Sequence, residues 1–315
     1  MSDTNGLPTI ALSGCTGQVG SRLIEALSGQ ANLVVYTRRP DAARERLKNP
    51  SRCTFVEADV TQAGPWQSEL AKADAVVNLF GERIFNRRWT QSFKELLLSS
   101  RIDSTSRIVD ALKSREKPAV WINASAIGFY GASGPEVSDE NAPAGTDLLA
   151  QLSVEWEEAM NRHPLPAVRK VALRIGIVLD PRAGALPKMA FPFRLFLGGK
   201  IGWGSYAQSW IHHADLTGLI LHALDQEAVR GPLNATAPNP VTNGELAQAL
   251  SKALHRPTLF PVPAWVLRIV LGEVATAICQ GRRVLPAKAL ATGYRFLFPT
   301  IDQALSDLFV PSRSR

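Results

Sequence analysis

The sequence has few cysteines and no set of residues arranged like metal ligands. Among its 315 residues the cysteines are Cys15, Cys53 and Cys279, an odd number of residues that lie far apart along the chain. This arrangement provides neither a disulfide framework nor a zinc-type ligand spacing. We therefore predict that the protein has no metal site and that it resides in a reducing compartment, the cytoplasm.

No segment has the pattern of a membrane span or an export signal. The first residues, MSDTNGLP, carry no positive charge and no apolar run. The apolar stretch Ala264–Gln280 contains Arg268 and Glu273, which are unfavourable in hydrocarbon. We expect no membrane partner.

The chain carries an excess of positive charge. Its 35 Lys and Arg residues and 28 Asp and Glu residues give a net charge of +7. Such a balance suits an anionic ligand or a nucleic acid. The basic pairs Arg38-Arg39, Arg87-Arg88 and Arg282-Arg283 belong to separate segments, and no zinc spacing or nucleic-acid-reading helix is found. We therefore expect a small-molecule ligand and no nucleic acid.

Strand and helix patterns alternate through the first half of the sequence. Short apolar runs predict strands at 9–13, 33–37, 53–58, 75–79, 119–124 and 168–179. Helical spacing or composition predicts helices at 18–28, 41–48, 66–73, 90–114 and 147–162. This alternation implies parallel pairing through right-handed crossovers. The predicted fold class is α/β, a Rossmann doubly wound parallel sheet.

After Leu179 the pattern changes to a region rich in glycine, proline and aromatic residues. A helix is predicted from about Asp215 to Leu224, and a second helix begins at Thr242, where Glu245 completes a capping-box pattern. We predict a Rossmann domain of residues 1–170 plus about 208–238. Residues 171–207 and 239–315 would form a smaller mixed α/β lobe.

The most informative segment is the glycine-rich sequence between the first predicted strand and helix. It reads Gly14-Cys15-Thr16-Gly17-Gln18-Val19-Gly20. The first glycine allows a tight turn, the second lets a diphosphate approach the backbone, and the third lets the helix pack on the strand. The following helix N-terminus offers N–H groups and a positive dipole to phosphates. The segment therefore predicts a dinucleotide site.

The spacing GxxGxxG resembles that of the extended short-chain dehydrogenase/reductase superfamily, which includes nucleotide-sugar epimerases and dehydratases. Further landmarks are Asn78-Leu79-Phe80-Gly81, Ser125 with Tyr130-Gly131, Leu173-Arg174-Ile175-Gly176 and Trp210–Leu216. The sequence is most similar to an atypical, nucleoside-diphosphate-sugar epimerase-like branch. The branch pattern is carried by Arg88-Trp89-Thr90, Ser100–Thr105, Gly184–Met189, Leu197-Gly198-Gly199 and, near the C-terminus, Leu271-Gly272-Glu273 and Gln280–Pro286.

Two arginines indicate which nucleotide is bound. The second predicted strand ends in Tyr36-Thr37-Arg38-Arg39-Pro40, where an NAD site needs a carboxylate for the ribose hydroxyls. Two guanidinium groups can instead hold a 2′-phosphate in forked geometry. We predict NADP(H) as the cofactor; the alternative is a solvated arginine pair in a surface loop.

Other cofactor contacts are predicted at the ends of the remaining strands. Asp59 resembles the superfamily acid that contacts adenine, and it is equally suited to cap the turn that follows. Leu79-Phe80-Gly81 is expected to run beside the diphosphate and the inner ribose. The predicted cofactor-binding set is Gly14, Cys15, Thr16, Gly17, Gln18, Val19, Gly20, Thr37, Arg38, Arg39, Asp59, Val60, Leu79, Phe80, Gly81, Glu82, Arg101, Ala124 and Gly176.

The acid–base pair implied by the resemblance is missing. The superfamily uses Tyr-x-x-x-Lys, in which the lysine lowers the pKa of the tyrosine so that the phenol can exchange a proton. None of the four tyrosines here has a lysine four residues later, and Leu149 and Ser153 stand at the expected positions. The superfamily serine falls at Ala126, next to Ser125. We predict Tyr130, Ser125 and Arg101 as the replacement catalytic groups.

Two functions are consistent with this sequence. The first is an NADP(H)-dependent oxidoreductase or epimerase-like enzyme that acts on an unidentified small molecule. The alternative is a catalytically silent NADPH-binding sensor or regulatory protein. Relatives often pair through the long helices after the fourth and fifth strands, so a homodimer is possible.

Overall fold

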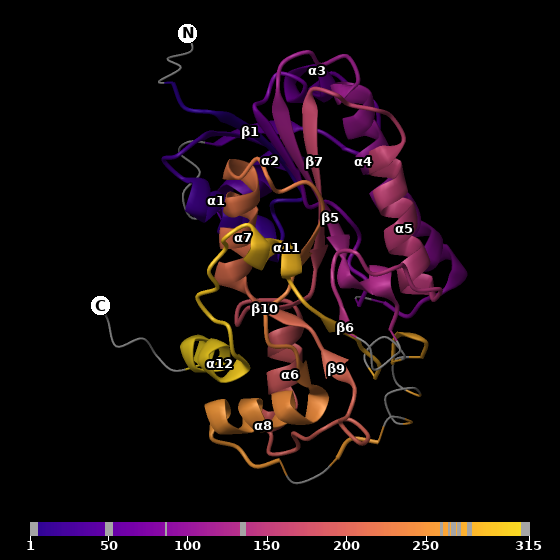
Figure 1. Cartoon of the computed structure of the whole chain (residues 1–315), viewed down its shortest axis with the longest axis vertical. Coiled ribbons are helices and arrows are strands. Elements are labelled where there is room, and N and C mark those ends of the chain that lie inside the picture. The colour runs from indigo at the N-terminus through magenta and orange to yellow at the C-terminus, as the bar shows by residue number, and fades with distance from the viewer. Residues whose placement is uncertain are drawn as a thin grey trace.

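Seven parallel strands form the main sheet, in the order β11-β7-β5-β4-β1-β2-β3 (Figure 1). Its strands are β1 (Thr9–Ser13), β2 (Asn32–Thr37), β3 (Cys53–Glu57), β4 (Ala75–Asn78), β5 (Ala119–Ala126), β7 (Val168–Ile175) and β11 (Gly231–Ala235). The computed structural model describes residues 6–47, 53–85, 87–132, 137–258, 261–263, 265, 269, 272–275 and 279–309. The predicted helix end at Lys48 and the motif residue Leu271 lie outside these residues. The predicted Rossmann sheet is confirmed.

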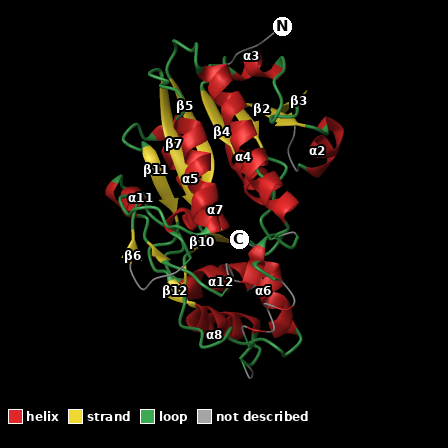
Figure 2. Cartoon of the chain, turned by 90° about the vertical axis from the view of Figure 1, so that its right-hand side faces the viewer, coloured by secondary structure: helices red, strands yellow, loops and turns green. Residues whose placement is uncertain are grey.

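Helices cover both faces of this sheet (Figures 1 and 2). One face packs against α1 (Gln18–Leu27), α7 (His213–Asp225) and α11 (Ala287–Ala291). The other packs against α3 (Trp66–Leu70), α4 (Gln91–Leu112) and α5 (Leu148–Asn161). The short α2 (Pro40–Arg46) connects β2 to β3. Leu23, Ile24 and Leu27 are buried on one side of α1, as its helical spacing predicts.

The order of the strands places a switch point between β1 and β4. From β1 the chain first moves outward through β2 and β3 and then returns to add β4 on the other side of β1. Ligands of doubly wound folds bind in the crevice that such a reversal creates, outside the carboxyl ends of the strands. The glycine turn follows β1 directly at this point.

The strand predicted over 168–179 is in fact two strands in different sheets. It breaks at Gly176, between β7 and β8 (Ile177–Leu179), and β8 pairs with β10 (Trp210–His212). A Cβ at Gly176 would lie 2.8 Å from the Ser209 carbonyl oxygen and 3.0 Å from Thr236 Cγ2. Only a glycine allows the segments that contain Ser209 and Thr236 to approach this closely. The chain leaves the main sheet at this residue and continues as β8, which pairs with β10.

The smaller lobe contains α6 (Ala185–Arg194), α8 (Asn243–Leu254), α12 (Ile301–Phe309) and the pair β9 (Ala207–Gln208) and β12 (Val241–Thr242). The predicted capping box is present: Thr242 Oγ1 accepts from the Glu245 N–H, and Glu245 Oε2 accepts from the Thr242 N–H. The sequence does not predict helix α6, because Pro192 lies inside it and Gly184 provides no side-chain cap.

The C-terminal segment contacts both lobes: α12 packs against α8 in the smaller lobe, and the residues before α12 contact the Rossmann domain. Strand β13 (Arg283–Val284) pairs with β6 (Val137–Ser138), and Tyr294 packs against the core beneath α7. The backbone N–H groups of Leu297 and Phe298 donate to the Asp215 carboxylate on α7. Within the described residues, no helix is both long enough and apolar enough to cross a membrane. The division into two domains stays a prediction, although all of β7, through Ile175, belongs to the main sheet.

Candidate nucleotide-binding site

The glycine turn after β1 lies directly against the end of β4. Gly14 has a φ of +70°, and a Cβ there would lie 2.5 Å from the Phe80 nitrogen and the Leu79 carbonyl carbon. A Cβ at Gly20 would lie 2.2 Å from the Cys15 Cα. The first and third glycines therefore have the conformational and packing roles predicted from the sequence.

Gly17 has a different environment. A Cβ at this position would meet only the Gly14 carbonyl oxygen, at 3.3 Å, so the remaining space beside its Cα is open. Gly17 is also the N-cap of α1, and no acidic residue occurs in the first turn of that helix. Open space beside a backbone that presents a helix N-terminus fits a diphosphate.

The smaller lobe reaches this helix N-terminus. Gly184, the N-cap of α6, has a φ of +83°, and a Cβ there would lie 2.2 Å from Gln18 Oε1. Gln18 Nε2 is buried and forms no hydrogen bond with the described residues. Nearby, Arg22 on α1 donates through Nε and Nη2 to the buried Asp180 carboxylate, at 3.2 and 3.0 Å. These contacts fix the lobe against the predicted diphosphate site.

The two arginines predicted to bind a 2′-phosphate follow β2 at the same edge. The side chains of Arg38 and Arg39 are exposed, and Arg39 is the N-cap of α2. Asp59, after β3, accepts from the Thr61 N–H and hydroxyl at 3.0 and 2.7 Å. Burial opposes the charge of this carboxylate, but the bonds from Thr61 and the Arg38 charge together lower its pKa. Asp59 therefore caps the turn that follows it, and it lies close enough to Arg38 for the arginine's positive charge to stabilise the carboxylate.

Arg101 of α4 supports the loop that follows β4. Arg101 Nη2 donates to the Glu82 carbonyl oxygen at 3.0 Å and Nη1 to the Leu97 carbonyl oxygen at 2.8 Å. A Cβ at Gly81 would lie 3.3 Å from the Arg101 Cζ. Burial lowers the pKa of Arg101 to about 10, so it remains charged at neutral pH. Arg101 is buried and supports the loop at 81–82.

A buried hydrogen-bond network connects the carboxyl ends of β5, β7 and β11. Ser125 Oγ donates to Glu157 Oε1 at 2.6 Å, and Arg174 binds both carboxylate oxygens of Glu157 at 2.8 Å. Arg174 Nη1 also donates to the Tyr130 hydroxyl at 2.8 Å, and that hydroxyl donates to Asn234 Oδ1 at 2.7 Å. Burial raises the pKa of the Tyr130 phenol, and Arg174 offsets this only in part. Tyr130 is therefore a protonated donor inside the network.

Sequence reasoning missed Glu157, although a signal for it exists. Positions 149, 153 and 157 are four residues apart on α5 and share one face of the helix. The predicted tyrosine and lysine positions hold Leu149 and Ser153, and Ser153 Oγ donates to the Leu149 carbonyl oxygen at 2.8 Å. Following the same face by one more turn would have identified Glu157. A catalytic role for Ser125, Tyr130 or Arg101 stays a prediction, and the geometry gives each of them a supporting role.

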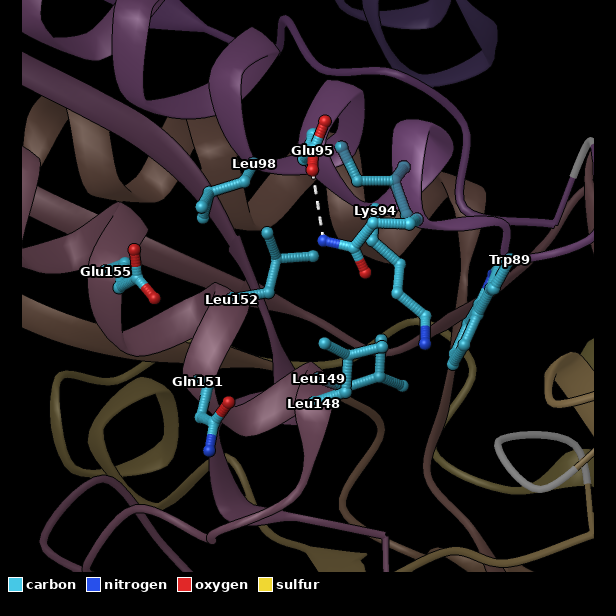
Figure 3. A pocket seen from close by; sticks show the side chains of 11 residues that line it. Trp89, Lys94, Glu95, Leu98, Leu148, Leu149, Gln151, Leu152 and Glu155 are labelled. Atoms are coloured by element: carbon cyan, nitrogen blue, oxygen red, sulfur yellow. Dashed lines mark hydrogen bonds between the residues drawn. The ribbon is translucent and has the colours of Figure 1, made fainter.

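A groove of about 200 Å³ lies between α4 and α5 (Figure 3). Trp89 and Lys94 line one side, and Leu149 and Leu152 line the other. No residue of the predicted cofactor-binding set lines it. The groove is therefore separate from the nucleotide site. The groove is lined by α4 and α5, the long helices through which relatives often pair. A homodimer formed through these helices stays a prediction.

His212 has a structural role as a helix cap. His212 is buried, its Nδ1 accepts from the Ala214 N–H at 3.1 Å, and it thereby caps α7. Burial lowers the pKa of His212 to about 3, and the charges of His213 and Arg22 contribute. In the part of the chain that the structure describes, no three histidine, cysteine or carboxylate side chains cluster as metal ligands would.

Comparison with known proteins agrees with this arrangement. Residues 10–150 match the NAD dependent epimerase/dehydratase family, and residues 262–308 match a domain of unknown function, DUF1731. The mouse epimerase family protein SDR39U1 is 38% identical over 305 residues, covering 95% of this chain and 99% of the mouse protein. The epimerase family protein YfhF of Bacillus subtilis is 36% identical over 307 residues, covering 97% of this chain and 99% of YfhF.

A solved structure extends the likeness to three dimensions. The crystal structure of human epimerase family protein SDR39U1 (isoform 2) with NADPH superimposes with a TM-score of 0.82 at 33% identity, covering 95% of this chain and 98% of the human chain. The chain therefore belongs to the NAD dependent epimerase/dehydratase family, together with SDR39U1 and YfhF, and its own C-terminal residues match DUF1731.

Proposed function

We propose that this chain binds NADPH at the carboxyl edge of its main sheet and transfers hydride between this cofactor and a small molecule. The open space beside Gly17, at the N-terminus of α1, carries the proposal because it fits a diphosphate. The human relative that was crystallised with NADPH supports the choice of ligand.

The arginine pair supports NADPH over NADH. Arg38 and Arg39 are exposed at the end of β2, where an NAD-binding fold places a carboxylate. Asp59 is the carboxylate that could replace this missing ribose acceptor. Its Oδ1, however, already accepts two hydrogen bonds from Thr61, and the positive charge of Arg38 lowers its pKa. The 2′-phosphate of NADPH would therefore be attracted by the two arginines. The ribose hydroxyls of NADH would lack the carboxylate that usually accepts hydrogen bonds from them.

Separate groups of residues would bind the cofactor and support its site. Gly14 to Gly20 and the first turn of α1 hold the diphosphate, and Arg101 fixes the loop at Gly81 and Glu82. The network of Ser125, Glu157, Arg174 and Tyr130 holds the ends of β5 and β7 in place. When bound, NADPH would supply the hydride for reduction of a carbonyl group, whereas an epimerisation would need NADP+, which would take a hydride from the substrate and return it.

One observation favours the alternative of a silent NADPH-binding sensor. The face of α5 that carries the tyrosine and lysine in the superfamily holds Leu149 and Ser153, and the Tyr130 hydroxyl is already bonded to Arg174 and Asn234. A sensor needs the cofactor site but no proton donor.

A turnover assay separates the two functions. Purified protein is mixed with NADPH and a panel of aldehydes, ketones and quinones, and the absorbance of the reduced cofactor is followed. We expect consumption with at least one class, loss of that consumption in Gly17→Ala, and no change in Lys72→Ala, whose ion pair is exposed and remote. Tight binding without consumption would favour the sensor, and absence of binding would contradict both functions.

A further inference from the structure

Exposed apolar side chains gather at the end of α6 and on the loop that follows it. We name this set the α6 patch, and its members are Phe191 (60% exposed), Leu195 (52%), Phe196 (53%), Leu197 (61%) and Trp203 (91%). Single exposed apolar residues are common on protein surfaces, but large ones that follow each other within thirteen residues indicate an interaction site. None belongs to the predicted cofactor-binding set.

The packing of Phe193 and the backbone conformation at Phe196 accompany this exposure. Phe193 is buried, and its ring fills the space beside Gly198, where a Cβ would lie 2.2 Å from Phe193 Cγ. The four residues between Phe193 and Gly198, Arg194 to Leu197, are all exposed. Phe196 has a φ of +61°, a conformation that is strained for a side chain of its size. The strain is not offset by burial of the ring within the chain.

Trp203 is at the tip of a hydrogen-bonded turn. The Gly204 N–H donates to the Ile201 carbonyl oxygen at 3.0 Å, and the Gly202 N–H donates to the Val262 carbonyl oxygen at 2.9 Å. The Ile201 N–H donates to Asn243 Oδ1 at 2.7 Å. Three bonds therefore hold a turn whose indole is almost fully in solvent, so its exposure is a property of the fold.

The segment that carries the patch contains basic residues and no acidic residue. Between Asp180 and Asp215 the sequence has no acidic residue. Of its basic residues, Arg182 is paired with Glu25 on α1 at 3.4 Å, and Lys188, Arg194 and Lys200 make up the rest. A second acid-free segment lies between Glu245 and Glu273, and its Arg256 lies 4.7 Å over the Phe196 ring. The occupant of this surface must therefore be anionic as well as apolar.

We propose that the α6 patch docks on an anionic phospholipid surface, with its aromatic and leucine side chains in the interface and its basic side chains on the headgroups. Tryptophan with aliphatic neighbours and basic residues is the composition that binds lipid interfaces. A second copy would place like charges opposite each other. A single-stranded nucleic acid would stack on aromatic rings but would leave Leu195 and Leu197 without a role.

This proposal departs from the sequence-based expectation of no membrane partner, which was argued only from the lack of a membrane span and an export signal. An interfacial patch buries side chains only to the depth of the headgroups, so it needs no long apolar helix. The inference goes beyond the proposed function and does not depend on cofactor binding. It would bring the protein close to apolar molecules dissolved in the bilayer.

Vesicle sedimentation tests the proposal with the full-length chain in the absence of NADPH. We expect the protein to bind vesicles of mixed phosphatidylcholine and phosphatidylserine, to bind pure phosphatidylcholine weakly, and to be released by salt. The double variant Arg194→Glu/Lys200→Glu should weaken binding by at least about tenfold, because each basic group near such a surface contributes about 1 kcal/mol. The matched double variant Lys72→Glu/Lys113→Glu, on the Rossmann domain, should change binding by less than about threefold.

The apolar contribution has its own control. Leu197→Ser/Trp203→Ser should abolish sedimentation with vesicles, whereas Leu297→Ser, at a leucine that is 68% exposed and outside the patch, should not. Circular dichroism and NADPH titration show whether each variant is folded. Equal binding to neutral and anionic vesicles, or equal losses in patch and control variants, would overturn the proposal. So would retention of a single-stranded oligonucleotide, or a dimer in sedimentation velocity that the patch variants dissociate, if anionic vesicles are not bound.

Discussion

Arg174 and Glu157 form a two-bond ion pair beneath the carboxyl ends of β5 and β7, with both nitrogen–oxygen distances at 2.8 Å. The side chains are 4% and 13% exposed, and each also holds a neighbour: Glu157 accepts from Ser125, and Arg174 donates to Tyr130. Although burial works against its charge, Glu157 raises the pKa of Arg174 above its usual value. The pair thus ties α5 to the sheet at the edge where the cofactor is proposed to bind.

Glu157→Ala should be strongly destabilising. It leaves the buried Arg174 charge without its partner, a change that typically lowers the free energy of unfolding by about 3–5 kcal/mol. Urea unfolding measures this loss. The control is Glu69→Ala, which removes an exposed pair with Lys72 and should have an effect of about 0–1 kcal/mol. Similar losses in the two variants would show that the buried pair has no special role.

Gly14→Ala should prevent the turn from forming. Its Cβ would overlap the backbone of Leu79 and Phe80 at 2.5 Å, and the φ of +70° is unfavourable for alanine. Gly29→Ala is the matched control, because Gly29 has a φ of +84° with no atom within 4 Å of its Cβ position. We expect about 1–2 kcal/mol of destabilisation at Gly29 and a much larger loss, or no folded protein, at Gly14. Comparable melting temperatures would contradict the packing of β1 against β4.

Gly17→Ala should separate binding from folding. The backbone of Gly17 is extended, with φ −80° and ψ −177°, and a Cβ there has only the Gly14 oxygen nearby. We therefore expect the free energy of unfolding to fall by no more than about 1 kcal/mol. The added methyl group would occupy the open space proposed for the diphosphate, so NADPH affinity should fall by at least about tenfold, as calorimetry can measure. Unchanged affinity would place the diphosphate elsewhere.

The stability of the fold should decrease as the pH falls from 6.5 to 5. His212 has an ordinary pKa of 6.5 and a folded-state pKa of about 3, because burial disfavours its charged form. Between these values the unfolded chain binds a proton that the folded chain does not, so protonation favours unfolding by up to about 1.4 kcal/mol per pH unit. The pKa values of His213 and His222 are also lowered by burial, and these residues add to the slope.

His212→Asn isolates one part of this effect. Asparagine can still cap α7 but cannot titrate. Urea unfolding at several pH values should therefore give a smaller slope between pH 5 and 6.5 for the variant than for the unchanged chain. Identical slopes would mean that His212 is protonated in the folded protein.

Six of the seven strands of the main sheet lie where short apolar runs predicted them, whereas β11 was not predicted. Short apolar runs that alternate with helices imply parallel strands joined by right-handed crossovers, and the three glycines of the turn have the spacing that β1, α1 and β4 require. The smaller lobe was less predictable. Helix α6 contains two prolines and begins at a glycine, and the break at Gly176 depends on Ser209 and Thr236, which are distant in sequence.

The polar network was outside the reach of local patterns. Ser125, Arg174 and Asn234 lie side by side only because β5, β7 and β11 pair in a particular register. Sequence reasoning could identify Ser125 and Tyr130 as polar groups near the edge, but it could not show that Glu157 and Asn234 bind them. The exposed position of Arg38 and Arg39, in contrast, follows from their place directly after β2.

Titration of both reduced cofactors against three proteins tests the central claim most directly. The unchanged chain should bind NADPH at least about tenfold more tightly than NADH, because a phosphate held by two guanidinium groups gains charge-assisted hydrogen bonds. Arg38→Ala/Arg39→Ala should lose this preference by weakening NADPH alone, and Arg46→Ala, an exposed arginine at the end of α2, should retain it. Equal affinities of the unchanged chain for NADPH and NADH would contradict the account.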